Sequence, residues 1–240
     1  GGKEVLVNNV EQEIVIAEVK GNNLVGKMVL VDDPARLYIK TTKTKEKKGE
    51  LITDYLDETG AIIGTNASGF YDADGHGTGG IIASKCLSDG VAWGDYDPQS
   101  LTIGFNKENE LFVGNISDTQ WKENNLRDCC QFKPALIIDG NQLVKGSSGW
   151  GIHPRTAIGQ RKDGVVFLLV IDGRQVGYSI GATVGDCADI MMKYGAVNAA
   201  VCDGGSSSVL AYNGKLINKP STSMRDTGRY LPNAWLVKSK

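Results

Sequence analysis

The chain has 240 residues, 41% of them apolar and 22% charged, which is enough for one sizeable core or a core with an appended subdomain. The formal net charge is −2 and the basic residues are spread along the chain, so the sequence lacks the basic excess that a nucleic-acid-binding surface requires. Glycine alone departs far from average, at 31 residues, and indicates many tight turns and close approaches of the backbone.

The cysteines and the hydropathy pattern exclude two further classes. The five cysteines are too few and too irregularly spaced for a disulfide scaffold, and no CxxC pair indicates zinc. Cys187 and Cys202 lie in apolar patterns that favour buried thiols, whereas adjacent Cys129 and Cys130 are interpreted as a surface pair rather than a redox pair. No stretch approaches the ~20 apolar residues of a membrane span, and no signal-peptide pattern follows Gly1. We therefore expect any membrane attachment to come from an anchor outside this chain.

The first sixty residues predict strands followed by one helix. Residues 13–19 and 24–31 alternate apolar and polar around a Gly-Asn-Asn turn, which predicts a hairpin, and 36–39 resumes as a strand. Residues 49–58 place apolar side chains on one helical face, closed by Gly60. We treat 1–48 as an N-terminal strand-rich accessory region and 49–240 as the main domain.

The middle of the chain predicts short strands and long loops. Residues 61–66 form a short buried strand that runs into a glycine-rich loop over 67–80. Residues 81–116 predict several short strands separated by Gly and Asn. A short helix with Ser117 as its N-cap is expected over 117–125.

The final hundred residues predict a strand, a helix and a second strand. Residues 165–171 are apolar throughout, which indicates a strand covered on both faces. Thr183 and Asp186 form a capping box at the start of an apolar helical stripe that Gly195 ends as a C′ residue. A strand over 197–202 then completes a β-α-β crossover with the two strands parallel. The expected fold is α+β, with a mixed sheet core and a few packed helices.

Three apolar segments end in Asp-Gly, at Asp139, Asp172 and Asp203. Asp-Gly after a strand is first a turn signal, and Asp139 fits that reading because a return strand follows. Asp172 is equally consistent with a turn residue and with a residue of a functional site. Asp203 precedes Gly-Gly-Ser-Ser-Ser, whose small side chains let a ligand approach the backbone N–H groups. At the carboxyl ends of parallel strands, Asp172 and Asp203 would share the edge where α/β sheets bind ligands.

An ordered set of segments resembles one known family, the phosphodiester glycosidases. The Cys-Asp-Gly-Gly-Ser-Ser-Ser segment at 202–208 resembles that family's Asp-Gly-Gly-Gly-Ser-Ser element. The other matching segments are 66–70, 154–159, 171–174, 181–183, and Arg225 followed by 232–234. The resemblance runs from about residue 50 to the C-terminus and is strongest over 153–236. Two departures occur: Ala67 and Ser68 replace a double glycine, and Ser206 replaces the third glycine of the later motif.

The resemblance implies hydrolysis of a glycosyl–phosphate bond at the anomeric carbon. The family includes the uncovering enzyme, which removes N-acetylglucosamine from a sugar–phosphate–sugar diester, and bacterial members resembling cell-surface or exopolysaccharide enzymes. It therefore implies a carbohydrate phosphodiester substrate in the cell envelope and an extracellular or cell-surface location.

The chemistry of that bond suggests a role for each candidate residue. Asp203 is the first choice for general base or nucleophile, with Asp172 as its partner, and Arg155 and Arg225 would hold the phosphate. His153 would donate a proton or contact the phosphate. The remaining candidates for substrate or phosphate binding are Asn66, Thr183, Gly204, Gly205 and Ser207.

Other residues near these motifs have weaker roles. If a divalent cation such as calcium takes part, Asp172 and Asp203 are the candidate ligands. Asp72-Ala-Asp74-Gly75 resembles a calcium loop but lacks the later ligands of an EF-hand. Arg174 is expected to be structural or paired with Asp172, and His76 to line the pocket mouth or to be exposed.

Two other function classes compete with the glycosidase. A carbohydrate-binding module without catalysis would show sugar-stacking aromatics, but the four tryptophans are dispersed. A serine hydrolase using residues 206–208 lacks the Gly-x-Ser-x-Gly elbow. A P-loop reading fails because no Gly-Lys-Ser/Thr ending is present.

Overall fold

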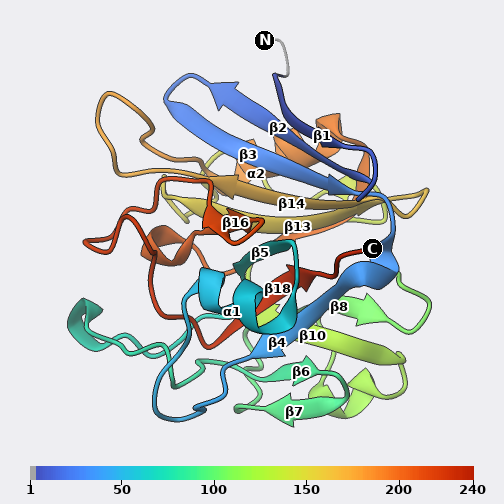
Figure 1. Ribbon diagram of the computed structural model, residues 1–240. Coiled ribbons are helices and arrows are strands. Elements are labelled where there is room, and N and C mark those ends of the chain that lie inside the picture. The colour runs from blue at the N-terminus through green and yellow to red at the C-terminus, as the bar shows by residue number, and fades with distance from the viewer. Residues whose placement is uncertain (1–3) are drawn as a thin grey trace.

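The computed structural model describes residues 4–240. Residues 1–3, which include Gly1 and belong to the predicted accessory region, lie outside the described part. Within it, the fold consists mostly of strands in three sheets with two α-helices, α1 (Ile52–Thr59) and α2 (Val184–Lys193) (Figure 1).

An eight-stranded sheet forms the upper half of the molecule in Figure 1. Its order is β1-β2-β3-β14-β13-β15-β11-β12, and every neighbouring pair is antiparallel. The strands are β1 (Val5–Asn9), β2 (Ile14–Gly21), β3 (Leu24–Val31), β14 (Val166–Ile171), β13 (Arg155–Arg161), β15 (Ala196–Val201), β11 (Ala135–Ile138) and β12 (Asn141–Gln142).

The predicted crossover exists in a modified form. β14 and β15 run in the same direction with α2 between them in sequence, but β13 lies between them and pairs antiparallel with both. The expected mixed sheet is therefore wrong for the described residues, because inserting β13 makes each pair of neighbours antiparallel. The carboxyl ends of β14 and β15 still share one edge, which places Asp172 and Asp203 there.

Two five-stranded antiparallel sheets form the rest of the fold. One has the order β7-β6-β10-β8-β9 and the other β17-β16-β5-β18-β4. The first contains β7 (Val91–Trp93), β6 (Cys86–Ser88), β10 (Leu126–Phe132), β8 (Leu101–Asn106) and β9 (Leu111–Gly114). The second contains β17 (Lys215–Leu216), β16 (Leu210–Tyr212), β5 (Ile63–Asn66), β18 (Asn233–Val237) and β4 (Leu37–Thr41). Four short 3-10 helices join the elements: η1 (Pro34–Arg36), η2 (Ala73–Gly75), η3 (Asp118–Trp121) and η4 (Gly205–Ser207).

The main core lies between the large sheet and the two smaller ones. Leu168 of β14 and Ile158 of β13 belong to the same buried cluster as Phe105 of β8 and Trp235 of β18. The rings of Phe105 and Trp235 meet edge to face, with centroids 5.7 Å apart. The alternate residues of β14 pack beneath α2, which explains why all six residues of that strand are buried. The predicted double coverage of this strand is confirmed.

Most local predictions are confirmed with small shifts at the ends of elements. The hairpin of β2 and β3 closes on Gly21 paired with Leu24, α1 ends at Gly60 in the left-handed region, and Thr183 caps α2. Asp139 and Gly140 both have positive φ, which confirms the tight turn into β12.

Two local predictions are wrong. The helix expected over 117–125 is only the 3-10 turn η3, since the chain enters turns after Trp121. Cys129 and Cys130 are fully buried on β10, because successive side chains of a central strand point into the two cores on either side. All five cysteines of the described chain are free and buried.

The predicted accessory region is built into the same sheets as the rest of the chain. β3 pairs with β14 over six residues, and β4 pairs with β18 over five. The proposed boundary at residue 48 therefore marks where the family resemblance begins, and the strands before it share their core with the strands after it.

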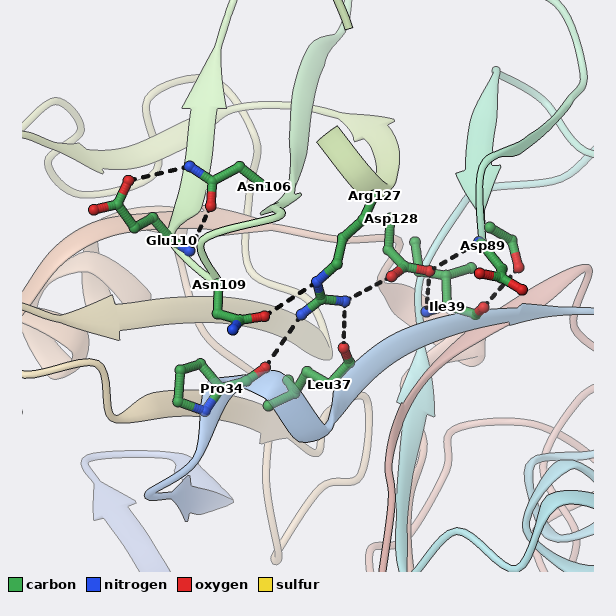
Figure 2. Close-up of polar contacts among 10 residues, drawn as sticks. Pro34, Leu37, Ile39, Asp89, Asn106, Asn109, Glu110, Arg127 and Asp128 are labelled. Atoms are coloured by element: carbon green, nitrogen blue, oxygen red, sulfur yellow. Dashed lines mark hydrogen bonds and ion pairs between the residues drawn. The ribbon is translucent and has the colours of Figure 1, made fainter. Parts of the chain in front are cut away.

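A polar network ties the two five-stranded sheets together, between β10 of one and β4 of the other (Figure 2). Arg127 of β10 donates to the carbonyl oxygens of Leu37 at 2.7 Å and Pro34 at 3.2 Å, and pairs with Asp128 at 2.6 Å. Asp128, itself buried, accepts from the backbone N–H of Ile39 at 3.0 Å. A buried charge needs such partners, so this pair fixes β10 against β4.

The described residues contain no helix that is both long and apolar enough to cross a membrane.

Candidate functional site

Three loops converge around Asp203, which follows β15. They are the glycine-rich loop after β5, the loop between β14 and α2, and the segment before β18; all three project to the left in Figure 1. Side-chain contacts join them: Arg229 pairs with Asp72, and Gln175 donates to the carbonyl oxygen of Lys219 at 2.8 Å. The site is therefore assembled from segments far apart in the sequence.

Asp203 is a half-buried carboxylate with few polar partners. Burial raises the pKa of its carboxyl from the usual range to about 6, although hydrogen bonds from the Ser207 side chain and the Gly204 backbone, and the charge of Arg229, favour the ionised form. Its own backbone is fixed, since its N–H donates to Ala67 at 3.0 Å and its carbonyl accepts from Asn66 at 2.6 Å. A pKa near neutrality suits a group that must exchange a proton.

The turn after Asp203 requires glycine. A Cβ on Gly204 would lie 2.9 Å from the carbonyl oxygen of Pro154, and Gly205 has a φ of +63° in the left-handed region. The Gly205 N–H donates to that same carbonyl at 2.9 Å, which holds the turn against the start of β13. Gly204 and Gly205 thus shape the loop, and Ser207 donates to the catalytic candidate.

Arg229 is the arginine next to Asp203. Its guanidinium pairs with both carboxylate oxygens of Asp72, contacts Ser206 Oγ at 3.4 Å and lies over the ring of Phe70 at 4.8 Å. Its charge lowers the pKa of Asp203, whereas the charge of Asp72 raises it. Two carboxylates thus flank one guanidinium.

Arg174 and His153 also lie near this turn. A Cβ on Gly205 would be 3.1 Å from a terminal nitrogen of Arg174, which is exposed and has a φ of +58°. Burial and the charges of Arg155 and Arg174 hold the pKa of His153 below its usual value, so this imidazole is neutral at pH 7. The site therefore presents two guanidinium groups around a glycine turn.

Asp172 supports the loops from beneath. Its carboxylate accepts from Tyr178 Oη at 2.9 Å, Asn218 Nδ2 at 2.9 Å and the backbone N–H of Lys219 at 3.1 Å, and the residue is 2% exposed. Because its oxygens are occupied and covered, Asp172 fixes two loops rather than facing a ligand. The expected pairing with Arg174 is not among the ion pairs of the described chain.

The two arginines predicted to hold phosphate are placed differently. Arg155 is buried, and its guanidinium donates to the carbonyl oxygens of Ala182, Trp150 and Gly151 at 2.9–3.1 Å. Its pKa is lowered by burial. Arg225 is exposed and has no hydrogen-bond or ion-pair partner in the described chain. Arg155 therefore fixes the loop that carries His153, while Arg225 lies on a neighbouring pocket.

Two buried asparagines hold the wall of the site. Asn66 donates to Asp203 and accepts from Thr156 at 2.8 Å and Val209 at 3.2 Å, which uses its polar atoms internally. Asn233 accepts from the backbone N–H of Ser68 at 2.9 Å and donates to its hydroxyl. Both residues position the loop rather than face the substrate. Thr183 caps α2 through Asp186.

The described residues contain no group of three or more His, Cys, Asp or Glu side chains arranged to hold a metal ion. Asp172 is occupied by donors, and Asp203 lies among arginines and serines. The Asp72 carboxylate of the calcium-like loop is engaged by Arg229, while Asp74 and His76 are exposed.

A separate cavity lies away from these residues. About 710 Å³ in volume, it is lined by Gln160, Arg161 and Asn198 at the opposite end of β13 and β15 from Asp203. Its amide groups are used internally: Gln160 accepts from the N–H of Leu111, and Asn198 donates to the carbonyl oxygen of Leu111. Its size alone does not outweigh the chemistry gathered at Asp203.

Sequence reasoning missed Arg229, Ser206 and Asp72 as neighbours of Asp203. The family resemblance points to Arg225 with the Pro-Asn-Ala segment as the closing Arg…Asn element, but Arg229 is nearer to that segment and to β18. Proximity to a strand fixes a side chain better than a place in a long loop. Asp72 was noted only for its loop composition, and its contact with a residue 157 positions away has no local signal.

The fold and the site together describe a class of protein: a β-rich fold that carries a carboxylate of raised pKa beside arginines. Such a site is suited to an anionic ligand. A family model described as phosphodiester glycosidase matches residues 59–238. The chain belongs to the phosphodiester glycosidase family, which confirms the resemblance stated from the motifs.

Individual relatives agree with that assignment. A SPbeta prophage-derived uncharacterized protein of Bacillus subtilis (strain 168), YomE, is 28% identical over 200 residues, 79% of this chain and 29% of that protein. Bovine N-acetylglucosamine-1-phosphodiester alpha-N-acetylglucosaminidase is 35% identical over 75 residues, 31% of this chain and 14% of that protein. The chain thus spans less than a third of either relative.

A solved structure shows the same fold. The catalytic domain of the zebrafish N-acetylglucosamine-1-phosphodiester alpha-N-acetylglucosaminidase superposes with a TM-score of 0.77 and 19% identity, covering 95% of this chain and 82% of that one.

Proposed function

We propose that this protein hydrolyses the bond between an anomeric carbon and a phosphodiester oxygen, with Asp203 as the working carboxylate. The observation that carries the proposal is the environment of Asp203: half buried, with a pKa raised to about 6 and with Arg229 beside it. A carboxylate poised near neutrality beside a charged partner is a common feature of catalytic sites.

The reaction sets two electrostatic demands. As the C1–O bond breaks, positive charge develops on the sugar and negative charge on the leaving phosphate. Asp203, once ionised, stabilises the sugar and either attacks C1 or accepts a proton from the attacking water. The products are the free sugar, carrying the hydroxyl of water at C1, and a phosphate monoester.

Arg229 and Arg174 are the groups we assign to the phosphate, in place of Arg155 and Arg225. Arg174 lies near Gly205 and Arg229 contacts Ser206, so phosphate oxygens placed over the turn would have two guanidinium groups nearby. Guanidinium groups bind phosphate through paired hydrogen bonds. His153, neutral at pH 7, would donate a hydrogen bond rather than a charge.

We further propose that the substrate is a sugar-1-phosphodiester of the cell envelope or of an exopolysaccharide, met at the cell surface or outside the cell. The name of the bovine relative supports N-acetylglucosamine as the first sugar to test. Bacterial members of the family resemble envelope enzymes, which supports the wider class of glycan.

The experiment is hydrolysis of an N-acetylglucosamine-1-phosphodiester by the purified protein, followed by identification of both products. We expect free N-acetylglucosamine and a phosphate monoester. Asp203→Asn should lower kcat/KM by about 10³-fold, since one general acid–base or nucleophilic group contributes on that order. Running the assay with and without a chelator measures any need for a divalent cation separately.

Asp139→Asn is the matched control, because Asp139 also ends a strand in Asp-Gly but occupies a plain turn that asparagine tolerates. We expect it to keep the wild-type rate. An Asp203→Asn variant as active as the wild type would remove Asp203 from the mechanism. Absence of hydrolysis on every glycosyl phosphodiester tried would favour the non-catalytic carbohydrate-binding module.

A further inference from the structure

A second pocket lies next to the proposed phosphate site. It has a volume of about 390 Å³ and is lined by Gln175, Leu216, Asn218, Lys219, Pro220, Arg225 and Asp226. Gln175 directly follows Arg174, whose guanidinium lies near Gly205, and Asn218 of the lining donates to the carbonyl oxygen of Ser208 at the end of the same turn. The pocket therefore adjoins the turn over which we propose that the scissile phosphate binds.

The floor of this pocket is rigid. Asn218 is buried and donates to both Asp172 and the carbonyl oxygen of Ser208, while its own oxygen accepts from Leu210 at 2.7 Å. Lys219 donates its backbone N–H to Asp172 and accepts from Gln175. The buried carboxylate that supports the active-site loops therefore also fixes this pocket.

The charge of the pocket is unbalanced. Among the described residues, Arg225 has no hydrogen-bond or ion-pair partner, and the ammonium of Lys219 lies 4.2 Å from the ring centroid of Tyr178 without an ion pair. Asp226 is the single acidic residue in the lining. The lining thus has two cations, Lys219 and Arg225, and one anion, on a chain whose net charge is −2, while the Asp172 carboxylate beneath it is covered by its own donors. Two exposed cations without a carboxylate partner beside a polar pocket attract an anionic group.

We propose that this pocket is a subsite for a second phosphate, carried by the part of the substrate beyond the scissile phosphodiester. The inference rests on the proposed function for its first phosphate. It narrows the substrate class from a single sugar-1-phosphodiester to a glycan with at least two phosphate groups, of which Arg225 and Lys219 bind the outer one.

The test compares three substrates of equal length, whose alcohol portions end in a phosphate, a carboxylate or a neutral hydroxyl. Wild-type kcat/KM should be highest for the phosphate-ended diester, by about fivefold to tenfold over the neutral one, the gain expected from two partly exposed charge pairs. The preference should shrink in 0.5 M salt, at roughly a 4 Å Debye length. Equal rates on the three substrates, or a carboxylate arm as good as the phosphate arm, would overturn the proposal.

The double variant Lys219→Gln/Arg225→Gln should bring the ratio of phosphate-ended to neutral substrate close to one. Both side chains are exposed, so the variant is expected to fold. Lys162→Gln, at the far cavity, is the matched charge control and should keep the wild-type ratio. A double variant that retains the full preference contradicts the assignment.

Calorimetry separates this proposal from the proposed function. Wild type should bind 1,3-propanediol bisphosphate more tightly than propyl phosphate, and the double variant should lose that difference. Suppose that no diester is hydrolysed, but that the wild type prefers the bisphosphate and the double variant does not. The proposed reaction then fails while the subsite stands. If the two probes bind the wild type equally, the subsite fails whatever the activity.

Discussion

The raised pKa of Asp203 suits a group that exchanges a proton near neutral pH, but it lowers the free energy of unfolding at that pH. Because burial raises its pKa to about 6, the folded protein holds this proton more tightly than the unfolded chain does. Ionisation of Asp203 therefore destabilises the fold above pH 6, and the cost disappears as the pH falls below about 4, where the carboxyl is protonated in both states. The position of this carboxylate therefore costs stability, which is consistent with the catalytic role that we propose for it.

Asp203→Asn should therefore be more stable than the wild type at pH 7.5. We expect a gain of about 1 kcal/mol in the free energy of unfolding, less than the pKa shift alone implies because the group is partly exposed. At pH 4 the gain should vanish. Denaturant unfolding at the two pH values measures it, and a variant less stable than the wild type at pH 7.5 would contradict the burial argument.

At the residue scale, Asp203 could be predicted from the sequence as the candidate carboxylate, whereas its neighbour Arg229 could not. Asp203 could be found because its turn of small residues is a local pattern. Arg229 could not, since its position depends on Asp72 and Phe70, which lie in a loop about 150 residues earlier. Asp172 was ambiguous for the same reason: its donors Tyr178 and Asn218 come from two different loops.

At the element scale, the loop after β5 controls the position of Arg229. Asp72 binds both guanidinium nitrogens, Gly77 accepts another hydrogen bond at 3.2 Å, and Phe70 stacks beneath. Asp72 thus acts as a positioning residue, holding Arg229 through the loop rather than touching substrate itself.

Asp72→Asn should lower kcat/KM by about fivefold to tenfold, because a weaker partner leaves the Arg229 guanidinium less well oriented. It should also move the acid limb of the pH profile to lower pH, since the Asp72 charge raises the pKa of Asp203. Asp74→Asn is the matched control, because Asp74 is exposed in the same loop but does not pair with Arg229. If the two variants have the same rate and the same pH profile, Asp72 does not position Arg229.

Elements with strong local signals were predicted well. α2 carries its own cap, an apolar stripe and a C′ glycine, and β14 is apolar throughout. The helix expected over 117–125 failed because a favourable N-cap, confirmed at Ser117, begins a helix but cannot extend it without a buried face.

At the scale of the whole molecule, strand order lay beyond the sequence. β4 pairs with β18 although about 190 residues separate them, and β13 enters between β14 and β15. β10 had no prediction at all, yet it is central in its sheet and carries Arg127 and Asp128, which tie that sheet to β4. Such pairings depend on contacts between distant segments, which no local pattern encodes.

The pH dependence of kcat/KM tests the central claim most directly, because it reports the ionisation of the free enzyme. With an N-acetylglucosamine-1-phosphodiester, we expect a plateau above about pH 7 and a tenfold fall per pH unit well below pH 6, as Asp203 takes up its proton. His153→Gln should keep this acid limb, which separates Asp203 from the other group that titrates in the range. A profile that stays level from pH 4.5 to 8, or that falls above pH 6, would contradict an ionised Asp203 as the working carboxylate.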